Sequence, residues 1–285
     1  MSTGEAVFRQ LQNRARSDGA KAGKPTPTAE YLTRHVLESF LERLARTDHR
    51  DNFILKGGIL LAVYGVRRPT KDVDSEAVNV SVTPEHIVDV VRHVAAVDVA
   101  DGVWFDVDTV SIQEIRDDAE YPGRRVRVNC RVGPQMLVVV WDISTGDPIV
   151  PLPRPVKVPR VLGHDIEMLG YAPETTVAEK GVTILERGTA STRWRDYIDI
   201  VQLSEKHGVD EDLLLESAQA VARYRKIALG PIAPVIAGYG AIGQVKWAAW
   251  RRKERHEDVS EPYLDAQMAK VAAVLDPVFR RSDRA

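Results

Sequence analysis

Two aspartates, Asp72 and Asp74, stand two residues apart in residues 70–80, where carboxylates occupy alternate positions. Alternate side chains of a strand point to one face, so these carboxylates would lie together, roughly 7 Å apart at their Cα atoms. Asp142 follows the strongly apolar residues 136–141, and a buried strand seldom ends in a carboxylate that has no partner. Carboxylate oxygens suit hard divalent cations. The three aspartates therefore predict a metal site for Mg²⁺ or Mn²⁺.

A pair of glycines, Gly57 and Gly58, precedes the short apolar residues 59–64, which we expect to form a buried helix. Backbone N–H groups at the start of a helix bind anions, and glycine leaves their approach open. Lys56 is the adjacent cation, and Thr70 would share the strand face of Asp72. A glycine pair alone is more often a simple turn. The ordered set of glycine turn, short helix and Asp-x-Asp is more specific, and it predicts that these residues bind phosphate groups.

The elements that must position these residues can be read from apolar periodicity and turn signals. Apolar residues recur at helical spacing after Pro27, and valines alternate with arginines before the Gly133-Pro134 turn, which predicts a hairpin. The proline-rich residues 148–159 form a seam between two halves, with room for one further strand. The predicted helices cover residues 26–44, 83–97, 174–187, 193–207, 210–227, 233–253 and 261–275, and the predicted strands cover 53–55, 70–80, 103–110, 125–132 and 136–143. This order predicts an α+β domain followed by helices.

The composition is that of an ordinary globular protein, with 44% hydrophobic residues, a net charge of −2 and the single cysteine Cys130. No apolar run is long enough for a membrane span and no signal peptide is evident, so we expect a cytoplasmic protein. Residues 1–25 predict a flexible basic arm. The basic residues 246–255 are a second candidate anion-binding surface, with Trp247 and Trp250 as possible stacking platforms, although both could equally be solvated or core segments.

The sequence resembles the AbiEii-type nucleotidyltransferase toxins, including the MenT group, of the DNA polymerase β-like superfamily. The likeness spans about residues 53–200 and is carried by four segments: residues 53–74, Asp142-Ile-Ser-Thr-Gly-Asp147, Glu179-Lys180 and Asp196-Tyr-Ile-Asp199. It implies a polymerase β-like domain with a mixed sheet at 26–165 and a helical domain at 166–285 that closes the active-site cleft. It further implies that Asp72 and Asp74 bind metal and act in catalysis.

The same resemblance implies that Lys180 and Asp196 serve catalysis or the nucleotide. Asp196 and Asp199 lie three residues apart on one helical face, where they could orient Lys180 or Arg193. Ordinary salt bridging between helices is the alternative. The family motif commonly has serine after the first glycine, where this chain has Gly58, so one hydroxyl contact to phosphate would be lost.

The function implied is transfer of a nucleotide from a nucleoside triphosphate (NTP) to the 3′ end of tRNA, which blocks aminoacylation and growth. A cognate antitoxin is the expected partner, and phosphorylation of Thr70 is one way in which it could silence the site. Two alternatives remain open, namely nucleotide transfer to a protein hydroxyl and a non-catalytic nucleotide-binding module.

Overall fold

The computed structural model describes residues 3–23, 25–115 and 123–284, and the chain divides into two compact units. Unit 1 comprises Met1–Val63, Arg67–Gly146 and Arg154–Gly170. Unit 2 comprises Tyr64–Val66, Asp147–Pro153 and Tyr171–Ala285. Lys24 of the predicted basic arm lies outside the described residues.

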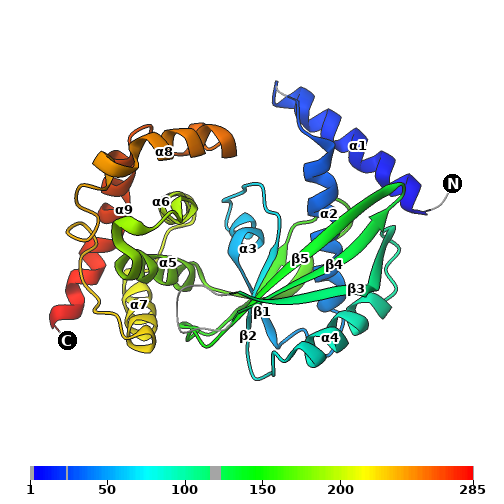
Figure 1. The fold of residues 1–285 in the computed structure, drawn as a ribbon, viewed down its shortest axis with the longest axis horizontal. Coiled ribbons are helices and arrows are strands. Elements are labelled where there is room, and N and C mark those ends of the chain that lie inside the picture. The colour runs from blue at the N-terminus through cyan, green and yellow to red at the C-terminus, as the bar shows by residue number, and fades with distance from the viewer. Residues whose placement is uncertain (1–2, 24, 116–122, 285) are drawn as a thin grey trace. The chain divides into compact units, whose positions relative to one another are not determined.

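Unit 1 is built on one mixed sheet, which has seven strands within the described residues, in the order β3-β4-β5-β2-β1-β7-β6 (Figure 1). Its strands are β1 (Phe53–Lys56), β2 (Val73–Ala77), β3 (Val103–Ile115), β4 (Gly123–Val132), β5 (Gln135–Thr145), β6 (Arg154–Val158) and β7 (Ile166–Gly170). β2 runs parallel to β5 and antiparallel to β1, and β1 runs parallel to β7. The predicted mixed sheet is confirmed. Because β7 belongs to this sheet, unit 1 extends beyond the predicted domain boundary at residue 165.

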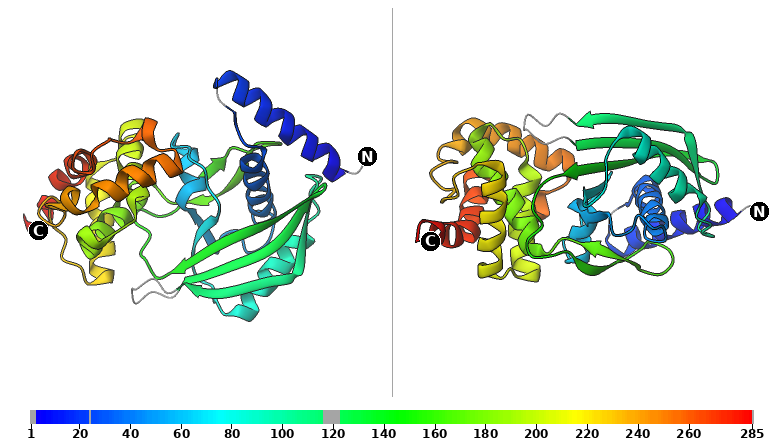
Figure 2. Two further views of the ribbon diagram at one scale, coloured as in Figure 1. Left: turned by 45° about the horizontal axis from the view of Figure 1, so that its top comes forward. Right: turned by 90° about the horizontal axis from the view of Figure 1, so that it is seen from below.

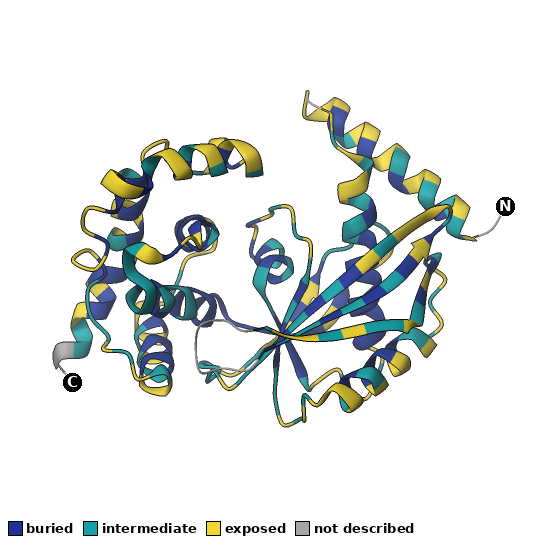
Figure 3. Cartoon of the chain, viewed as in Figure 1, coloured by how far each residue is buried: buried dark blue, intermediate teal, exposed yellow. Residues whose placement is uncertain are grey.

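Two helices of unit 1, α2 (Thr28–Leu44) and α4 (Pro84–Ala96), pack against the same side of β3–β5 (Figure 1). The Thr83 side chain caps α4 by accepting a hydrogen bond from the His86 backbone N–H, as the Thr-Pro pair predicts. The strands turn alternate apolar residues toward these helices, and Figure 3 shows the resulting alternation of burial along β3–β5. On β4 the buried residues are Val126, Val128, Cys130 and Val132.

The N-terminal segment is not the flexible basic arm that we predicted. Residues Thr3–Lys21 form helix α1, which packs against α2 and β4 and buries Val7, Leu11 and Ala15 (Figure 2). These residues recur every four positions, a helical spacing that could have predicted the packing. The arginines Arg9, Arg14 and Arg16 lie on the exposed side of this helix. The segment therefore presents the predicted basic surface, but from a packed helix.

Unit 2 is helical, as predicted, and contains α5 (Pro173–Arg187), α6 (Trp194–His207), α7 (Glu211–Arg225), α8 (Tyr239–Glu254) and α9 (Leu264–Phe279). α8 begins later than the predicted residue 233 because Gly238 takes a left-handed conformation with a φ of 76°. Trp247 is fully buried and stacks on Trp250 at 5.4 Å, so Trp247 is a core residue and not the stacking platform considered above. Among the helices of the described residues, none is both long and apolar enough to cross a membrane.

Candidate active site

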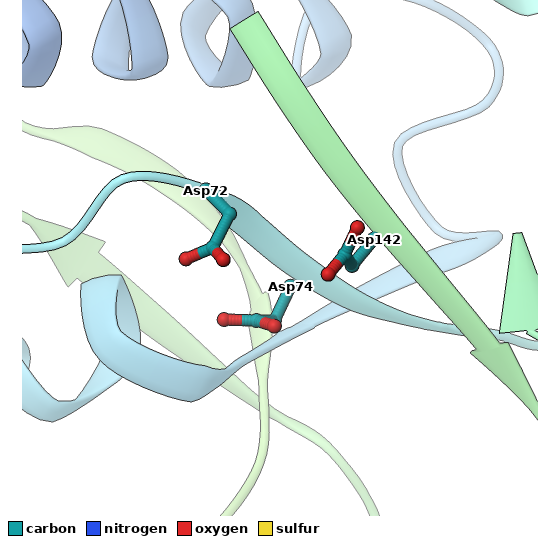
Figure 4. A group of neighbouring side chains, drawn as sticks. All are labelled: Asp72, Asp74 and Asp142. Carbon is teal, nitrogen blue, oxygen red and sulfur yellow. The ribbon is translucent and has the colours of Figure 1, made fainter. Parts of the chain in front are cut away.

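The three predicted metal-binding aspartates of unit 1 come together at the edge where β2 meets β5 (Figure 4). Parallel pairing places Asp74 directly opposite Asp142, and Asp72 immediately precedes β2. One carboxylate oxygen from each residue lies within 4.8 Å of the others. All three side chains are half-buried, so they remain accessible to a ligand. This is an all-oxygen donor set of the kind that holds Mg²⁺ or Mn²⁺.

The ionised form of Asp74 is destabilised by its surroundings. Burial, together with the neighbouring carboxylates of Asp72 and Asp142, raises the pKa of Asp74 to about 7, and Lys56 and Arg68 oppose this only in part. A divalent cation bound by the three carboxylates would stabilise the ionised form of Asp74.

A partner that the sequence analysis missed is Arg125 of β4, which donates to both oxygens of Asp142, from Nε at 2.8 Å and from Nη2 at 2.6 Å. This hydrogen bonding to Asp142 raises the pKa of Arg125 and fixes the carboxylate in one orientation. The signal was present, because a hairpin that turns at Gly133-Pro134 pairs Val132 with Gln135, and counting back along both strands pairs Arg125 with Asp142.

Gly57 is required by the geometry of the cluster. It is the first residue of α3 (Gly57–Val63), it has a φ of 67°, and a Cβ added to it would overlap the carboxylate of Asp74. Only glycine combines this backbone conformation with so close an approach. The turn therefore brings the backbone at the start of α3 against the metal-binding side chains.

The lack of a side chain at Gly58 is explained by the position of Thr70. A Cβ added to Gly58 would overlap Thr70 Oγ1, so a side chain at position 58 and the present position of Thr70 exclude each other. Thr70 thus places a hydroxyl beside the position that the Cβ of a serine at 58 would occupy, and a contact of this hydroxyl with phosphate stays a prediction. The prediction that Thr70 shares a strand face with Asp72 is wrong, because β2 begins only at Val73 and Thr70 precedes it, next to Gly58.

Lys56 is paired with a carboxylate outside the aspartate cluster. Its Nζ lies 3.0 Å from Glu76 Oε2, and the Ser144 hydroxyl donates to the same oxygen at 2.6 Å. Glu76 is almost fully buried, so this pair neutralises a charge inside the sheet. The contribution of Lys56 to phosphate binding stays a prediction.

A cavity of about 220 Å³ adjoins the glycine turn in unit 1. Gly58, Ile59 and Ala62 of α3 form one wall, and residues 67–70 form another. The other walls come from α2 and β6, with the lining residues Thr26, Glu30, Tyr31, Arg34, Leu37, Glu38, Val158 and Pro159. The lining includes Gly58, which follows the Asp74-contacting Gly57 in the turn, whereas none of the three aspartates lines the cavity.

Unit 2 carries the second group of predicted residues, Lys180, Arg193, Asp196 and Asp199, and it brings all four together. Lys180 donates to Asp196 Oδ1 and, at 3.1 Å, to Asp199 Oδ2, while Arg193 Nε donates to Asp196 Oδ2 at 2.8 Å. Burial disfavours the ionised form of Asp196, yet Lys180 and Arg193 outweigh it and hold the pKa of Asp196 below its ordinary value. The predicted pairing is present, and the convergence of this group with the aspartates of unit 1 stays a prediction.

The titration of Asp74 leads to a test of metal binding. Its pKa is raised from 3.8 in the unfolded chain to about 7, so its ionisation destabilises the metal-free fold as the pH rises through that window. A divalent cation binds the ionised form and removes this cost. We therefore expect Mn²⁺ to raise the melting temperature more at pH 8 than at pH 5, as measured by differential scanning fluorimetry. An equal shift at both pH values would contradict the assignment.

The comparisons with known proteins address the whole chain. The family described as "Nucleotidyl transferase AbiEii toxin, Type IV TA system" matches residues 39–279, whereas no curated protein matches. The crystal structure of JHP933 from Helicobacter pylori is similar, with a TM-score of 0.50 at 14% identity, covering 89% of this chain and 94% of that chain. A second H. pylori structure, described as a candidate nucleotidyltransferase, has a TM-score of 0.48 at 14% identity, covering 89% and 96%.

At this level of identity the structural likeness to JHP933 concerns the fold alone, and it agrees with the predicted α+β architecture and its helical C-terminal part. The family match is broader evidence, because it includes the aspartate cluster, the glycine turn and the Lys180 group in one continuous span. The chain therefore belongs to the AbiEii nucleotidyl transferase toxin family of type IV toxin–antitoxin systems.

Proposed function

We propose that this protein transfers a nucleoside monophosphate from an NTP to the 3′-hydroxyl of a tRNA acceptor end, as expected for the MenT group. A tRNA with an altered 3′ end cannot be aminoacylated, so growth stops until a cognate antitoxin restrains the toxin. The observation that carries the proposal is the cluster of Asp72, Asp74 and Asp142, within 4.8 Å of one another, in a chain of this family.

The reaction requires one bond to form and one to break. The 3′-oxygen attacks the α-phosphorus, the bond from that phosphorus to the bridging oxygen breaks, and pyrophosphate leaves with the electron pair. The hydroxyl proton passes to the carboxylate cluster or to water. Mg²⁺ or Mn²⁺, when bound, supplies positive charge that activates the hydroxyl and neutralises the phosphates.

The chain's own residues have distinct tasks in this proposal. Asp72 and Asp74 would hold the metal, and the backbone N–H groups at the start of α3, next to Asp74, would bind the phosphates. Arg125 holds the Asp142 carboxylate in one orientation through two hydrogen bonds. In unit 2, Lys180 would neutralise charge on the departing pyrophosphate, with Asp196 and Asp199 as positioning residues that hold its ammonium group.

We place the nucleoside part of the NTP in the cavity beside Gly58 and Thr70. Its walls combine apolar side chains such as Leu37 and Ile59 with the cations Arg34 and Arg67, a mixture that suits a base and sugar attached to phosphates. Arg67 is an exposed residue at the wall of this cavity, where its guanidinium could pair with the phosphates of the NTP.

Filling the cavity tests this placement. Ala62→Phe projects a ring into the space, and we expect the KM for the NTP to rise at least about tenfold, as is usual when a pocket loses the room for its ligand. Steady-state kinetics against NTP concentration provides the measurement. Ala96→Phe, on an exposed position of α4, is the matched control and should leave KM unchanged. An unchanged KM in Ala62→Phe would place the nucleoside elsewhere.

The acceptor can be identified by the fate of a radioactive label. The purified protein is incubated with Mg²⁺, each labelled NTP and a bacterial lysate, and the products are then treated with ribonuclease or protease. Removal of the label by ribonuclease, together with sequencing of the tRNA 3′ ends, is the result that the proposal predicts. Removal by protease would instead indicate transfer to a protein hydroxyl, and NTP binding without any labelled product would indicate a non-catalytic module.

A further inference from the structure

The side of β3–β5 that faces away from α2 and α4 is continuous with the metal cluster, and we refer to it as the outer face. Residues directly opposite in neighbouring strands point to the same side of a sheet, so the ladder sorts the outer face into rows. The first row contains Asp142 and Arg125, in register with Asp74. The following rows are Val140 with Arg127, Val138 with Asn129 and Asp106, and Met136 with Arg131 and Trp104.

The last rows of the outer face expose large apolar side chains. Trp104 is 52% exposed, Met136 60% and Val138 44%. Met136 and Val138 lie on the same face of β5, and Trp104 of β3 lies in the row of Met136, with Arg131 of β4 between the two. The Arg131 guanidinium lies over the Trp104 ring, 5.6 Å from its centroid, which holds the indole in place on the surface. Neighbouring exposed apolar side chains of this size indicate a surface that a ligand covers.

The charges of the outer face favour a polyanion. Arg127 and Arg131 stand two rows apart, and Arg127 is held by a hydrogen bond from its Nη1 to Gln113 Oε1 at 2.7 Å. Asp106 is the acidic side chain paired into these later rows, and exposed Asp108 follows it in the bulge of β3; both lie on the edge strand. Alternating arginines with an exposed aromatic ring are the usual surface for single-stranded nucleic acid, where bases stack and phosphates pair with cations.

The rows of the outer face lead along β5 to the metal cluster. From the row of Met136 to that of Asp142, β5 advances six residues, or roughly 20 Å along the strand. A single-stranded nucleic acid that lies along the outer face would place its end at Asp142, on the β5 side of the cluster. The glycine turn lies on the α3 side of the cluster (Figure 4), and the cavity adjoins that turn. The outer face and the cavity are therefore formed by different elements on two sides of the aspartates.

We propose that the outer face binds the single-stranded 3′ end of the acceptor RNA, with Trp104 stacking on a base and with Arg127 and Arg131 pairing with phosphates. This inference rests on the proposed function, since it assigns the acceptor site of that reaction. The proposed RNA-binding surface is therefore the sheet, and not the basic residues 1–25 or 246–255 that the sequence suggested.

The test is fluorescence anisotropy with a short fluorescein-labelled single-stranded RNA, without NTP, over a series of salt concentrations. Trp104→Ala should weaken binding about tenfold or more, the usual effect of losing one stacked base. Arg131→Ala should reduce the slope of log affinity against log salt by about 0.7, whereas Arg131→Lys, which keeps the charge, should retain it. Arg92→Ala, an exposed arginine on α4, is the matched control and should bind as the wild type does. Equal melting temperatures exclude unfolding as the cause.

The outcomes separate this inference from the proposed function. If the wild type labels tRNA but Trp104→Ala and Arg131→Ala bind RNA normally, the outer face is not the acceptor site and the proposed reaction still stands. If the wild type binds RNA through these residues but labels none, the reaction fails while the RNA site remains. A wild-type dimer that Trp104→Ala converts to a monomer in size-exclusion chromatography with light scattering would overturn the inference, because a second copy would then cover this face.

Discussion

Replacing Asp74 with asparagine is expected to lower the rate of nucleotide transfer by at least about a thousandfold while leaving the protein folded. Asparagine keeps the size of the side chain but removes the charge that binds the metal, and the metal supplies several kcal/mol of transition-state stabilisation at about 1.4 kcal/mol per factor of ten. The measurement is the initial rate of incorporation of a labelled NTP into RNA at saturating Mg²⁺.

The control for Asp74→Asn is Asp98→Asn, an exposed aspartate of unit 1 that should transfer nucleotides at the wild-type rate. Without metal, Asp74→Asn should melt no lower than the wild type at pH 8, since the ionised carboxylate is raised in energy by burial and by Asp72 and Asp142. It should also lose the pH dependence of the Mn²⁺-induced stabilisation. If Asp74→Asn retains more than a tenth of the wild-type rate, Asp74 does not bind the catalytic metal.

Gly57→Ala is expected to give the second largest loss, at least about a hundredfold in rate, together with a lower melting temperature. Alanine at a φ of 67° costs about 1–2 kcal/mol, and its Cβ would also overlap the Asp74 carboxylate, so either the turn or Asp74 must move. A displacement of about 1 Å at a reacting centre is enough to cause such a loss in rate.

Gly23→Ala separates the two effects of the substitution at Gly57. Gly23 has almost the same φ, 65°, but a Cβ there would meet nothing within 4 Å. This variant should therefore show the strain in its melting temperature and keep the wild-type rate. If Gly57→Ala loses no more activity than Gly23→Ala, the close approach of the turn to Asp74 has no part in catalysis.

Much of the fold could be predicted from the sequence, because local patterns fix local elements. The alternation of valine and arginine in residues 125–132 predicted the hairpin, and the Thr83-Pro84 pair predicted the start of α4, since both signals act within a few residues. The strands β6 and β7 were harder to predict. β7 pairs with β1, more than a hundred residues earlier, and no local pattern records such a partner.

The candidate site also contains residues that the sequence predicted and residues that it did not. Asp72, Asp74 and Asp142 were predicted from alternate carboxylates and from a carboxylate after an apolar run, and the structure brings all three together. The predicted strand bounds were inaccurate, since Asp72 precedes β2 and Asp142 lies inside β5. The roles of Arg125 and Thr70 could not be read from residue type, since one depends on hairpin register and the other on the space left by Gly58. Helix α1 was not predicted, because the basic residues of this segment are typical of a mobile arm. The spacing of Val7, Leu11 and Ala15 is the signal that indicates a packed helix.

The central claim is that the aspartate cluster catalyses transfer of a nucleoside monophosphate. The most direct measurement compares the wild type and Asp74→Asn, each incubated with Mg²⁺, tRNA and the same NTP labelled at either its α- or its γ-phosphate. The account predicts that the α label enters RNA, that the γ label is released only as pyrophosphate, and that Asp74→Asn does neither. Entry of the γ label into the acceptor, or equal labelling by Asp74→Asn, would contradict it.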